Sequence, residues 1–473
     1  MKSLIENRFG LLVLVLVALL ALYGTASATR PGPAAQQPPG PRKVPVASVT
    51  AVCPDPAEAQ VGVVTPADGG ITGPGATTVT AGQKVLGTVD APGRPWYDEI
   101  PAKTGPVTVA ATGSSAAGLE AAQTRRETSG GMRGLAGARC AEPAASTWLV
   151  GPGPAAAEVT LHLTNADLAP AVVEILVYSG EGPVTGDASG TVTVGPGESR
   201  AVNLKELAPS PLVMAVEVRA VSGRVAAAAR AVMNGGKGVD WLPPAAPPAT
   251  SVVVPGVPGG GGKRELLVAS PAEADTLVEV RALTPDGTYA LKGRELVEVP
   301  AGSVATADLS TGIGGQPAAL VLTSDSPIVA GVIVTGTGKK PDVAFTAGAP
   351  ALDLGSVVAD NRTGKDKSSR LLLAAPETAG RVSVQVLPRS GEAPEPLQVD
   401  IAPARVEEVK LPKTDGAFAV VVLPLPDSGP VYGGRVMDEK LKDGLALTVQ
   451  PLAAARMWAL IPPITESTAV VLP

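Results

Sequence analysis

The sequence is poor in the side chains on which most enzyme active sites depend. It has one histidine, two cysteines and only 3% aromatic residues. The single histidine, His162, lies between Leu161 and Leu163 in an alternating stretch, so it points to the opposite face of the predicted strand from the two leucines. A catalytic triad or a histidine-based metal site would need this residue, and no G-x-S-x-G motif accompanies it. We therefore expect no catalytic residues, no metal and no cofactor, and a protein that is not an enzyme.

The charged residues give no indication of a nucleic-acid partner. The chain has 38 Lys and Arg against 44 Asp and Glu, a net charge of −6, and no basic cluster of the kind that binds nucleic acid. Residues 256–263 resemble a phosphate-binding loop, but Val257 and Arg264 stand where glycine and a hydroxyl residue are required. Residues 360–366 lack the spaced acids and the final glutamate of a calcium loop. Both segments are therefore predicted to be simple loops.

Small apolar residues and turn formers are what the sequence has in abundance. Hydrophobic residues make up 45% of the chain, and because aromatics are scarce this share consists mostly of Val, Ala and Leu. The 55 glycines and 48 prolines fall between alternating apolar runs and have no collagen-like period. This pattern is typical of many short β-strands joined by turns.

One pattern occurs three times along the chain. Each copy opens on an apolar run, continues with two alternating stretches and a turn, and closes on a long apolar strand. The copies begin at Trp148, Leu266 and Leu371, about a hundred residues apart, which is the length of a β-sandwich domain and too long for a solenoid unit. A pair of predicted strands joined by a polar loop leads into each of the last two copies.

These repeats predict an all-β fold of three tandem antiparallel β-sandwich-like (Ig-like) domains behind an N-terminal transmembrane or signal helix. The strands that precede each copy leave open whether neighbouring domains share sheets, and a closed propeller-like ring is the alternative architecture. The predicted parts are a signal anchor or signal peptide at 1–29, a Pro-rich linker at 30–43, an N-terminal β segment at 44–145, and sandwich repeats at 146–249, 250–345 and 346–473, the last with C-terminal strands.

The N-terminus predicts export from the cytoplasm. Lys2 and Arg8 precede an uncharged stretch, residues 9–29, that is just long enough to span a bilayer. Ala26-Ser27-Ala28 has the small-residue pattern of a signal-peptide cleavage site. Two interpretations compete: a single-pass anchor with a short N-terminus inside the cell, and a secretory signal that is cleaved near Ala28. Both place the body of the protein outside the cytoplasm.

The two cysteines predict a disulfide. An exported chain with an even cysteine count favours a Cys53–Cys140 bond, and the alternatives are two buried thiols or a redox pair without the usual C-x-x-C motif. The bond would join the first strand of the N-terminal β segment to the entrance of the first repeat. Residues 114–138, just before Cys140, mix alanine, leucine, charge and glycine, and here alone we predict a short, glycine-broken helix.

The stretch from Cys140 onward resembles a known family. The motifs that carry this resemblance are Cys140-Ala141-Glu142-Pro143, Trp148-Leu149-Val150-Gly151, Leu161-His162-Leu163-Thr164-Asn165 and Ala171-Val172-Val173-Glu174-Ile175, with Arg133-Gly134-Leu135-Ala136 upstream. Together they are similar to an actinobacterial family of exported, often membrane-anchored proteins known only as domain of unknown function 5719. The resemblance extends from residue 44 to the end and implies a β-rich extracytoplasmic protein. It brings no catalytic residues.

Two functional hypotheses fit these features. The first is a non-enzymatic, membrane-tethered structural or interaction protein of the cell envelope, with an envelope protein as its partner and the membrane contacted through the N-terminal helix. The second is a cell-wall polysaccharide-binding accessory module, which would need an aromatic platform. The candidate platform residues are Trp96, Tyr97 and Trp148. Their exposure on one surface would favour glycan binding, and their burial would count against it.

Overall fold

The computed structural model describes residues 8–28, 42–56, 58–67, 73–184, 190–291, 293 and 295–461. The chain divides into two units, residues 1–44 with 459–473, and residues 45–458. The first unit contains helix α1 (Arg8–Ala28) and most of a two-stranded sheet of β1 (Arg42–Pro45) and β36 (Trp458–Ile461). Residues 30–41 of the predicted linker and a C-terminal strand predicted at 469–472 lie outside the described residues.

Helix α1 has the composition of a membrane span or a signal sequence. Its residues Phe9–Ala28 carry no charge and have a mean hydropathy of 2.5. Twenty apolar helical residues match the hydrocarbon thickness of a bilayer, and a signal sequence passes the same test. The predicted N-terminal apolar helix is therefore confirmed, and its length and composition fit both the membrane anchor and the signal sequence.

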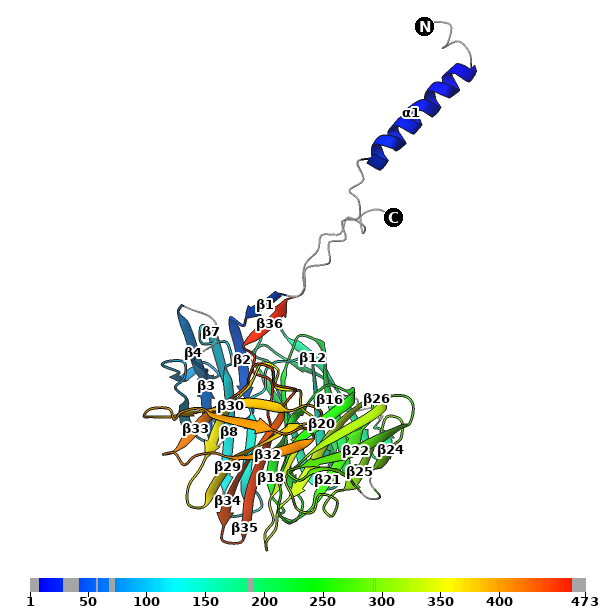
Figure 1. The fold of residues 1–473 in the computed structure, drawn as a ribbon. Coiled ribbons are helices and arrows are strands. Elements are labelled where there is room, and N and C mark those ends of the chain that lie inside the picture. Colours follow the sequence, from blue (N-terminus) through cyan, green and yellow to red (C-terminus); the bar gives the residue numbers. More distant parts are fainter. Residues whose placement is uncertain are drawn as a thin grey trace. The chain divides into compact units, whose positions relative to one another are not determined.

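Figure 1 shows that the second unit is built almost entirely of strands. These strands form four consecutive pairs of sheets. The first pair contains β2 (Ser48–Cys53), β3 (Ala59–Val64), β4 (Gly75–Ala81), β5 (Lys84–Thr88), β6 (Trp96–Ile100), β7 (Val107–Gly113), β8 (Glu120–Glu127) and β9 (Gly134–Arg139). The second pair contains β10 (Ser146–Pro152), β11 (Ala157–Thr164), β12 (Ala171–Ser179), β13 (Gly182–Pro183), β14 (Thr191–Val194), β15 (Ser199–Asn203), the short helix α2 (Leu204–Leu207), β16 (Val213–Ser222), β17 (Ala226–Met233), β18 (Val239–Leu242) and β19 (Pro244–Ala245).

The last two pairs continue this order. The third contains β20 (Ala249–Val257), β21 (Arg264–Ala269), β22 (Thr276–Thr284), β23 (Gly287–Ala290), β24 (Leu296–Val299), β25 (Val304–Asp308), β26 (Ala318–Thr335) and β27 (Val343–Ala347). The fourth contains β28 (Ser356–Arg362), β29 (Lys367–Ala375), β30 (Gly380–Pro388), β31 (Leu397–Ile401), β32 (Arg405–Lys410), β33 (Ala417–Pro424), β34 (Tyr432–Leu441) and β35 (Gly444–Pro451). We call these pairs the first to fourth sandwiches.

All four sandwiches share one strand order. One sheet of each runs β2-β7-β4-β5 or its equivalent: β10-β16-β12 with β13 and β14, β20-β26-β22 with β23 and β24, and β28-β33-β30-β31. The other runs β6-β3-β8-β9, β15-β11-β17-β18, β25-β21-β26-β27 and β32-β29-β34-β35. Strand β26 is long enough to serve both sheets of the third sandwich. The N-terminal β segment thus has the same topology as the three repeats recognised in the sequence.

The strands form because buried and exposed residues alternate along them. In β12 every second side chain from Ala171 to Ser179 is buried, and the apolar ones from Ala171 to Val177 join the core of the second sandwich. Glycines allow the turns between strands: Gly287, the first residue of β23, adopts φ +134°, a conformation that favours glycine. The predicted all-β, antiparallel fold is confirmed, while the domain boundaries drawn from the sequence stay a prediction.

Each sandwich packs against two others, so that the four form a cycle. Buried apolar side chains form each junction. The first and second sandwiches share a cluster with Ala136 and Trp241, and the second and third share one with Trp148 and Phe345. The third and fourth share a cluster with Val332 and Val436, and the fourth and first share one with Ala122 and Val421. Among the described residues, the named ladders join strands of the same sandwich, and an isolated bridge, Gly338–Gly444, crosses from the third to the fourth.

The predicted helix at 114–138 is wrong. The structure places β8 and β9 there, paired in antiparallel register from Ala122–Arg139 to Glu127–Gly134. The physical reason is that both faces of these strands are covered: Ala121 lies in the core of the first sandwich, whereas Ala122 packs on the fourth. A strand buried on both faces has small apolar residues at consecutive positions, and its alternation disappears from the sequence.

Candidate functional site

Four edge strands, one from each sandwich, meet at the centre of the cycle. They are β9, β18, β27 and β35, each the last strand in its sheet order, and each contacts the next in turn. Their carboxyl ends reach the same place, because residues 137–139, 141, 241–244, 348–350 and 449–453 line one cavity. This convergence makes that end of the axis the candidate functional site.

Asp342, the residue before β27, links all four sandwiches through hydrogen bonds. Its Oδ2 accepts the backbone N–H groups of Leu135 in the first sandwich and Leu447 in the fourth, each at 3.0 Å. Its Oδ1 accepts the N–H of Val343, and the backbone of Val239 in the second sandwich also donates to this carboxyl. Burial raises the pKa of Asp342 to about 7, although these hydrogen bonds act to lower it.

Two glycines make room for this carboxyl. A Cβ atom on Gly134 or on Gly238 would lie 2.2 Å from Oδ1 of Asp342, and the two residues have φ of +146° and +104°. No other residue type fits such a close approach in that backbone conformation. Asp342 therefore requires glycine at both positions. Gly134, at the start of β9, is about 200 residues away from it in the chain, and Gly238, just before β18, is about 100 residues away.

A second buried aspartate, Asp240, reinforces the centre. Its Oδ1 accepts the N–H of Gly137 at 2.9 Å, the N–H of Trp241 at 2.9 Å and the hydroxyl of Thr448 at 3.2 Å, which again joins three sandwiches. Burial raises its pKa well above the usual range. Arg435 is completely buried nearby, where its Nη2 donates to Gln450. The centre is therefore held by specific polar contacts rather than by apolar packing alone.

A narrow throat opens at the carboxyl ends of the four strands and continues into a wider groove. The throat is a cavity of about 70 Å³ whose walls are mostly alanine, glycine and proline, with Trp241 and Leu242. The groove has a volume of about 430 Å³ and shares Arg139, Ala141, Ala227 and Pro244 with the throat. Pockets that hold ligands usually have volumes of about 300–1,000 Å³. The groove is within this range and the throat is below it. We call the two together the mouth groove.

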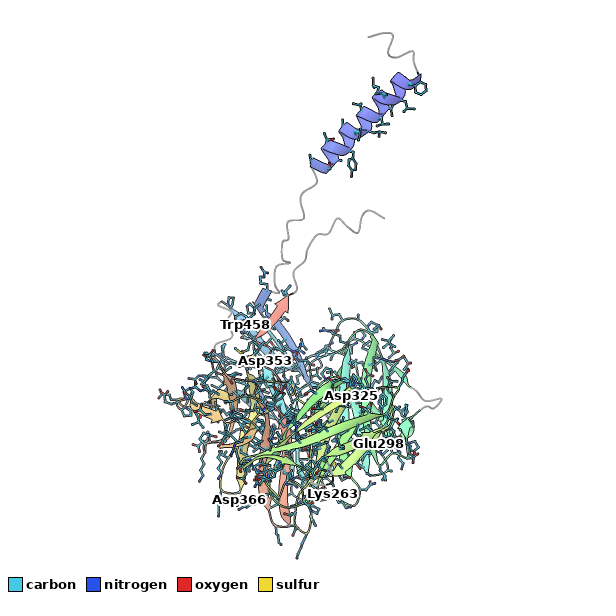
Figure 2. The ribbon with its side chains drawn as sticks, turned by 45° about the vertical axis from the view of Figure 1, so that its right-hand side comes forward. Lys263, Glu298, Asp325, Asp353, Asp366 and Trp458 are labelled. Atoms are coloured by element: carbon cyan, nitrogen blue, oxygen red, sulfur yellow. A yellow bond between two sulfur atoms is a disulfide. The ribbon has the colours of Figure 1, made fainter. Side chains whose placement is uncertain are left out.

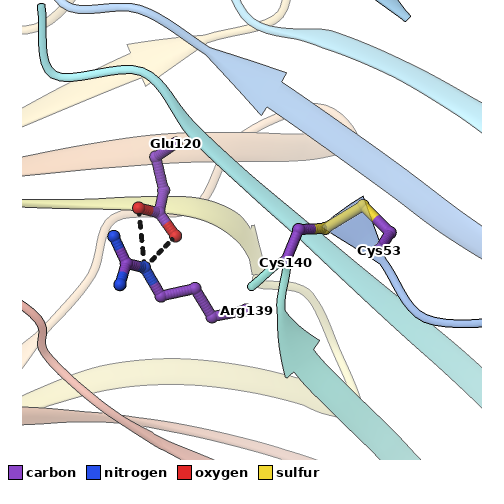
Figure 3. Close-up of a disulfide and its surroundings, with 4 residues drawn as sticks. All are labelled: Cys53, Glu120, Arg139 and Cys140. Atoms are coloured by element: carbon purple, nitrogen blue, oxygen red, sulfur yellow. Dashed lines mark hydrogen bonds and ion pairs between the residues drawn. A yellow bond between two sulfur atoms is a disulfide. The ribbon is translucent and has the colours of Figure 1, made fainter. Parts of the chain in front are cut away.

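The arginines of the mouth groove are paired with glutamates, and its other carboxylate, Glu217, accepts the hydroxyl of Ser146 at 3.1 Å. Arg139 donates through Nε to both carboxylate oxygens of Glu120, at 2.7 and 2.8 Å (Figure 3). Glu142 lies 2.9 Å from Arg456 and 4.0 Å from Arg139. Burial raises the pKa of Glu120, and the positive charge of Arg139 counteracts this. The groove therefore offers no unpaired arginine to a polyanion.

The disulfide borders this site. Cys53 at the end of β2 is bonded to Cys140, the residue after Arg139, and both are buried (Figure 3). The predicted disulfide is thereby confirmed. It fixes the start of the segment 140–147, which forms one wall of the groove.

The three aromatic candidates do not form an open platform. Tyr97 is 3% exposed and donates its hydroxyl proton to the carbonyl of Ala359 in the fourth sandwich, at 2.7 Å. Trp148 is 5% exposed and stacks on Tyr178 with ring centroids 5.5 Å apart. Trp96 is half-buried against Gly87. Trp148 alone of the three lines the mouth groove.

Comparison with known sequences then places the chain. The pattern of a family of unknown function, DUF5719, matches residues 98–412, more than half of the chain. The chain belongs to this family. No curated protein matches it. Among solved structures, β-glucuronidase 2 of Bacteroides uniformis aligns at 10% identity over 41% of this chain and 24% of that chain, with a TM-score of 0.10, a likeness too low to carry any argument.

A second groove of this DUF5719 chain is larger but chemically plainer. Its volume is about 650 Å³, and threonine, serine, glutamine, glycine and proline line it between the first and second sandwiches. Several of its hydroxyls are already engaged: Thr164 bonds to Ser199 at 2.9 Å, and Thr104 donates to the carbonyl of Pro101. No charged or aromatic side chain is among those lining it. The mouth groove is the better candidate site.

The two loops that resembled ligand-binding motifs connect the two sheets of a sandwich. Lys263 lies in the turn from β20 to β21, and Asp366 in the turn from β28 to β29, both at the surface (Figure 2). Within the described ranges, no three His, Cys, Asp or Glu residues are placed together as metal ligands would be.

His162 lies at the junction of the first and second sandwiches and not in the mouth groove. Its ring is 5.2 Å from that of Trp241, and burial, aided by Arg230, lowers its pKa to about 4. The unfolded chain would bind a proton near pH 6.5, so folding is penalised as the pH falls from 6.5 towards 4. We expect His162 to reduce the free energy of unfolding by about 2 kcal/mol between pH 7 and pH 4.5.

The measurement is urea unfolding of the parent and of His162→Phe, which keeps an aromatic ring beside Trp241 but does not titrate. Asp342 acts in the opposite sense, since its raised pKa favours the folded state at low pH, and it is common to both proteins. The parent should therefore lose more stability than the variant between the two pH values. Parallel pH profiles would show that His162 does not contribute.

Proposed function

We propose that this protein is a non-enzymatic, membrane-tethered interaction protein of the cell envelope that binds a partner protein in the mouth groove. The observation that carries the proposal is that the groove continues the axis on which all four sandwiches converge. A surface made by four interlocked elements is held rigid, and rigid, preformed surfaces lose less entropy on binding. The N-terminal apolar helix and the disulfide are compatible with an extracytoplasmic position.

The lining of the groove favours a protein over a glycan. Prolines at 244, 247 and 248 and the edge of Trp148 give it apolar walls, and its arginines are neutralised by glutamates. Sugar-binding sites usually offer an open aromatic face, and the rings of Tyr97 and Trp148 are buried. Neutral, partly apolar grooves suit polypeptide segments.

The proposal is tested by photo-cross-linking in cells. A benzoylphenylalanine replaces Pro247, an exposed residue of the groove, and in a matched control it replaces Glu298, an exposed residue of β24 in the third sandwich (Figure 2). We expect one recurring envelope protein to be cross-linked from position 247 and none from position 298. Absence of any protein adduct from position 247, with the protein co-sedimenting with purified cell wall, would overturn the proposal in favour of glycan binding.

A further inference from the structure

The backbone edge of β10 is open in the mouth groove at one residue, Ser146. On one side of it Ala144 bonds through its N–H and C=O to Val225, and on the other Trp148 pairs with Ala245. The short strand β19 pairs with β10 at only two positions, Trp148 with Ala245 and Leu149 with Pro244. Ala246, opposite Thr147, directs its N–H away from β10 and donates it to the carbonyl of Gly348, at 2.7 Å. The next bonded position would set Ser146 opposite Pro247, which has no N–H to donate.

The opposite edge of β10 fixes the direction in which Ser146 points. The N–H of Ala220 donates to the carbonyl of Ala145 at 2.7 Å, and β10 pairs with β16 in the register Ser146 to Arg219. In an antiparallel ladder bonded pairs alternate, so odd-numbered residues of β10 bond to β16 and even-numbered residues face the other way. The N–H and C=O of Ser146 therefore face the groove, and the described chain places no strand against them.

The throat beside this edge accepts a small apolar side chain. Its walls include Ala138, Ala141, Ala228 and Ala349, and its volume of about 70 Å³ leaves space for a few heavy atoms. An extended chain bonded to Ser146 would lie over Pro244 and Pro247 and alternate its side chains between the groove and solvent.

We propose that the mouth groove binds an extended segment of its protein partner by strand addition at Ser146, in the place that β19 leaves free. This rests on the proposed function and names the mode of recognition. Main-chain hydrogen bonds to an open edge supply affinity, and pockets for alternate side chains supply specificity. The segment recognised is uncharged where it crosses the paired arginines and carries a small apolar residue for the throat.

The test uses the full-length protein in detergent micelles and a phage-displayed library of random dodecapeptides. A selected peptide is synthesised, and its affinity is measured for the parent, for Ser146→Pro and for Ser146→Ala. Proline removes the N–H that faces the groove and leaves the bonds to β16 untouched, whereas alanine keeps the N–H. We expect Ser146→Pro to bind about tenfold more weakly, as for the loss of one hydrogen bond, and Ser146→Ala to bind like the parent.

A second measurement guards against misfolding of the proline variant. In the parent, the peptide should slow hydrogen exchange of the Ser146 amide. Equal peptide affinity of the proline and alanine variants, or unchanged exchange at Ser146, would overturn strand addition. The fate of the cross-link from position 247 separates the two proposals: an undiminished adduct in Ser146→Pro refutes strand addition alone, whereas no adduct in the parent refutes the interaction function itself.

Discussion

Replacing Asp342 by alanine is expected to lower the free energy of unfolding by about 3–5 kcal/mol. The carboxyl is completely buried and accepts N–H groups from Leu135, Val343 and Leu447, with Val239 as a further donor. Without it, these donors stay buried with no acceptor, and each such group costs about 1–3 kcal/mol. A cavity also opens beside Gly134 and Gly238.

The control is Asp443→Ala, the same change at a carboxylate that is partly exposed and 3.8 Å from Lys340. An exposed ion pair of this kind contributes about 0–1 kcal/mol, so this variant should unfold almost like the parent. Urea unfolding followed by tryptophan fluorescence gives the comparison. Hydrogen exchange adds a local readout, because the amides of Leu135 and Leu447 should lose protection in Asp342→Ala. Equal stability of the two variants would mean that Asp342 does not hold the centre together.

The sequence predicts the strands well because each is a local pattern. The alternation in β12 and β22 reflects one buried face of each strand. The helix α1 and the disulfide are also predicted, from an apolar run and from an even cysteine count. The sequence does not show the first sandwich as a copy of the others, and predicts only an N-terminal β segment there. Its strands β8 and β9 are covered on both faces, and the small residues this requires resemble a helical composition.

The centre of the cycle is not predictable in the same way. Asp240 lies within the short apolar strand β18, and Asp342 lies just before β27. Each is a single carboxylate in its segment, and its hydrogen-bond donors lie as far as about 200 residues away in the chain. Their one local trace is that glycine precedes or opens three of the four central strands, at Gly134, Gly238 and Gly444. A glycine at the start of an apolar strand, with an aspartate nearby, is a weak but physical indication of close approach.

The cycle is closed by contacts between the first and the fourth sandwich, which are the first and last along the chain. The second, third and fourth sandwiches share large continuous apolar cores with their chain neighbours. The first and fourth are joined by smaller apolar clusters and by charged groups, such as Arg126 with Glu439. The hydroxyl of Tyr97, which donates to the carbonyl of Ala359, adds to this seam. Anything that stabilises the first sandwich therefore also supports the groove that the cycle creates.

The Cys53–Cys140 disulfide is the covalent part of that support, and replacing both cysteines by alanine should lower the free energy of unfolding by about 4–5 kcal/mol. The bond spans 87 residues and contains almost all of the first sandwich, so in the chain-entropy model it removes much freedom from the unfolded chain. It also holds β2 against the end of β9, the strand that carries the first sandwich to the axis.

Urea unfolding of the double variant against the oxidised parent measures this effect, and the parent with dithiothreitol is the control for the substitution itself. Both sulfurs are buried, so the reductant should leave the folded parent intact and lower the midpoint only when the chain opens. Photo-cross-linking from position 247 should weaken in the double variant, because the wall at 140–147 is released at one end. A stability loss under about 1 kcal/mol, with the cross-link unchanged, would mean that the noncovalent contacts of Asp240 and Asp342 suffice to hold the cycle closed.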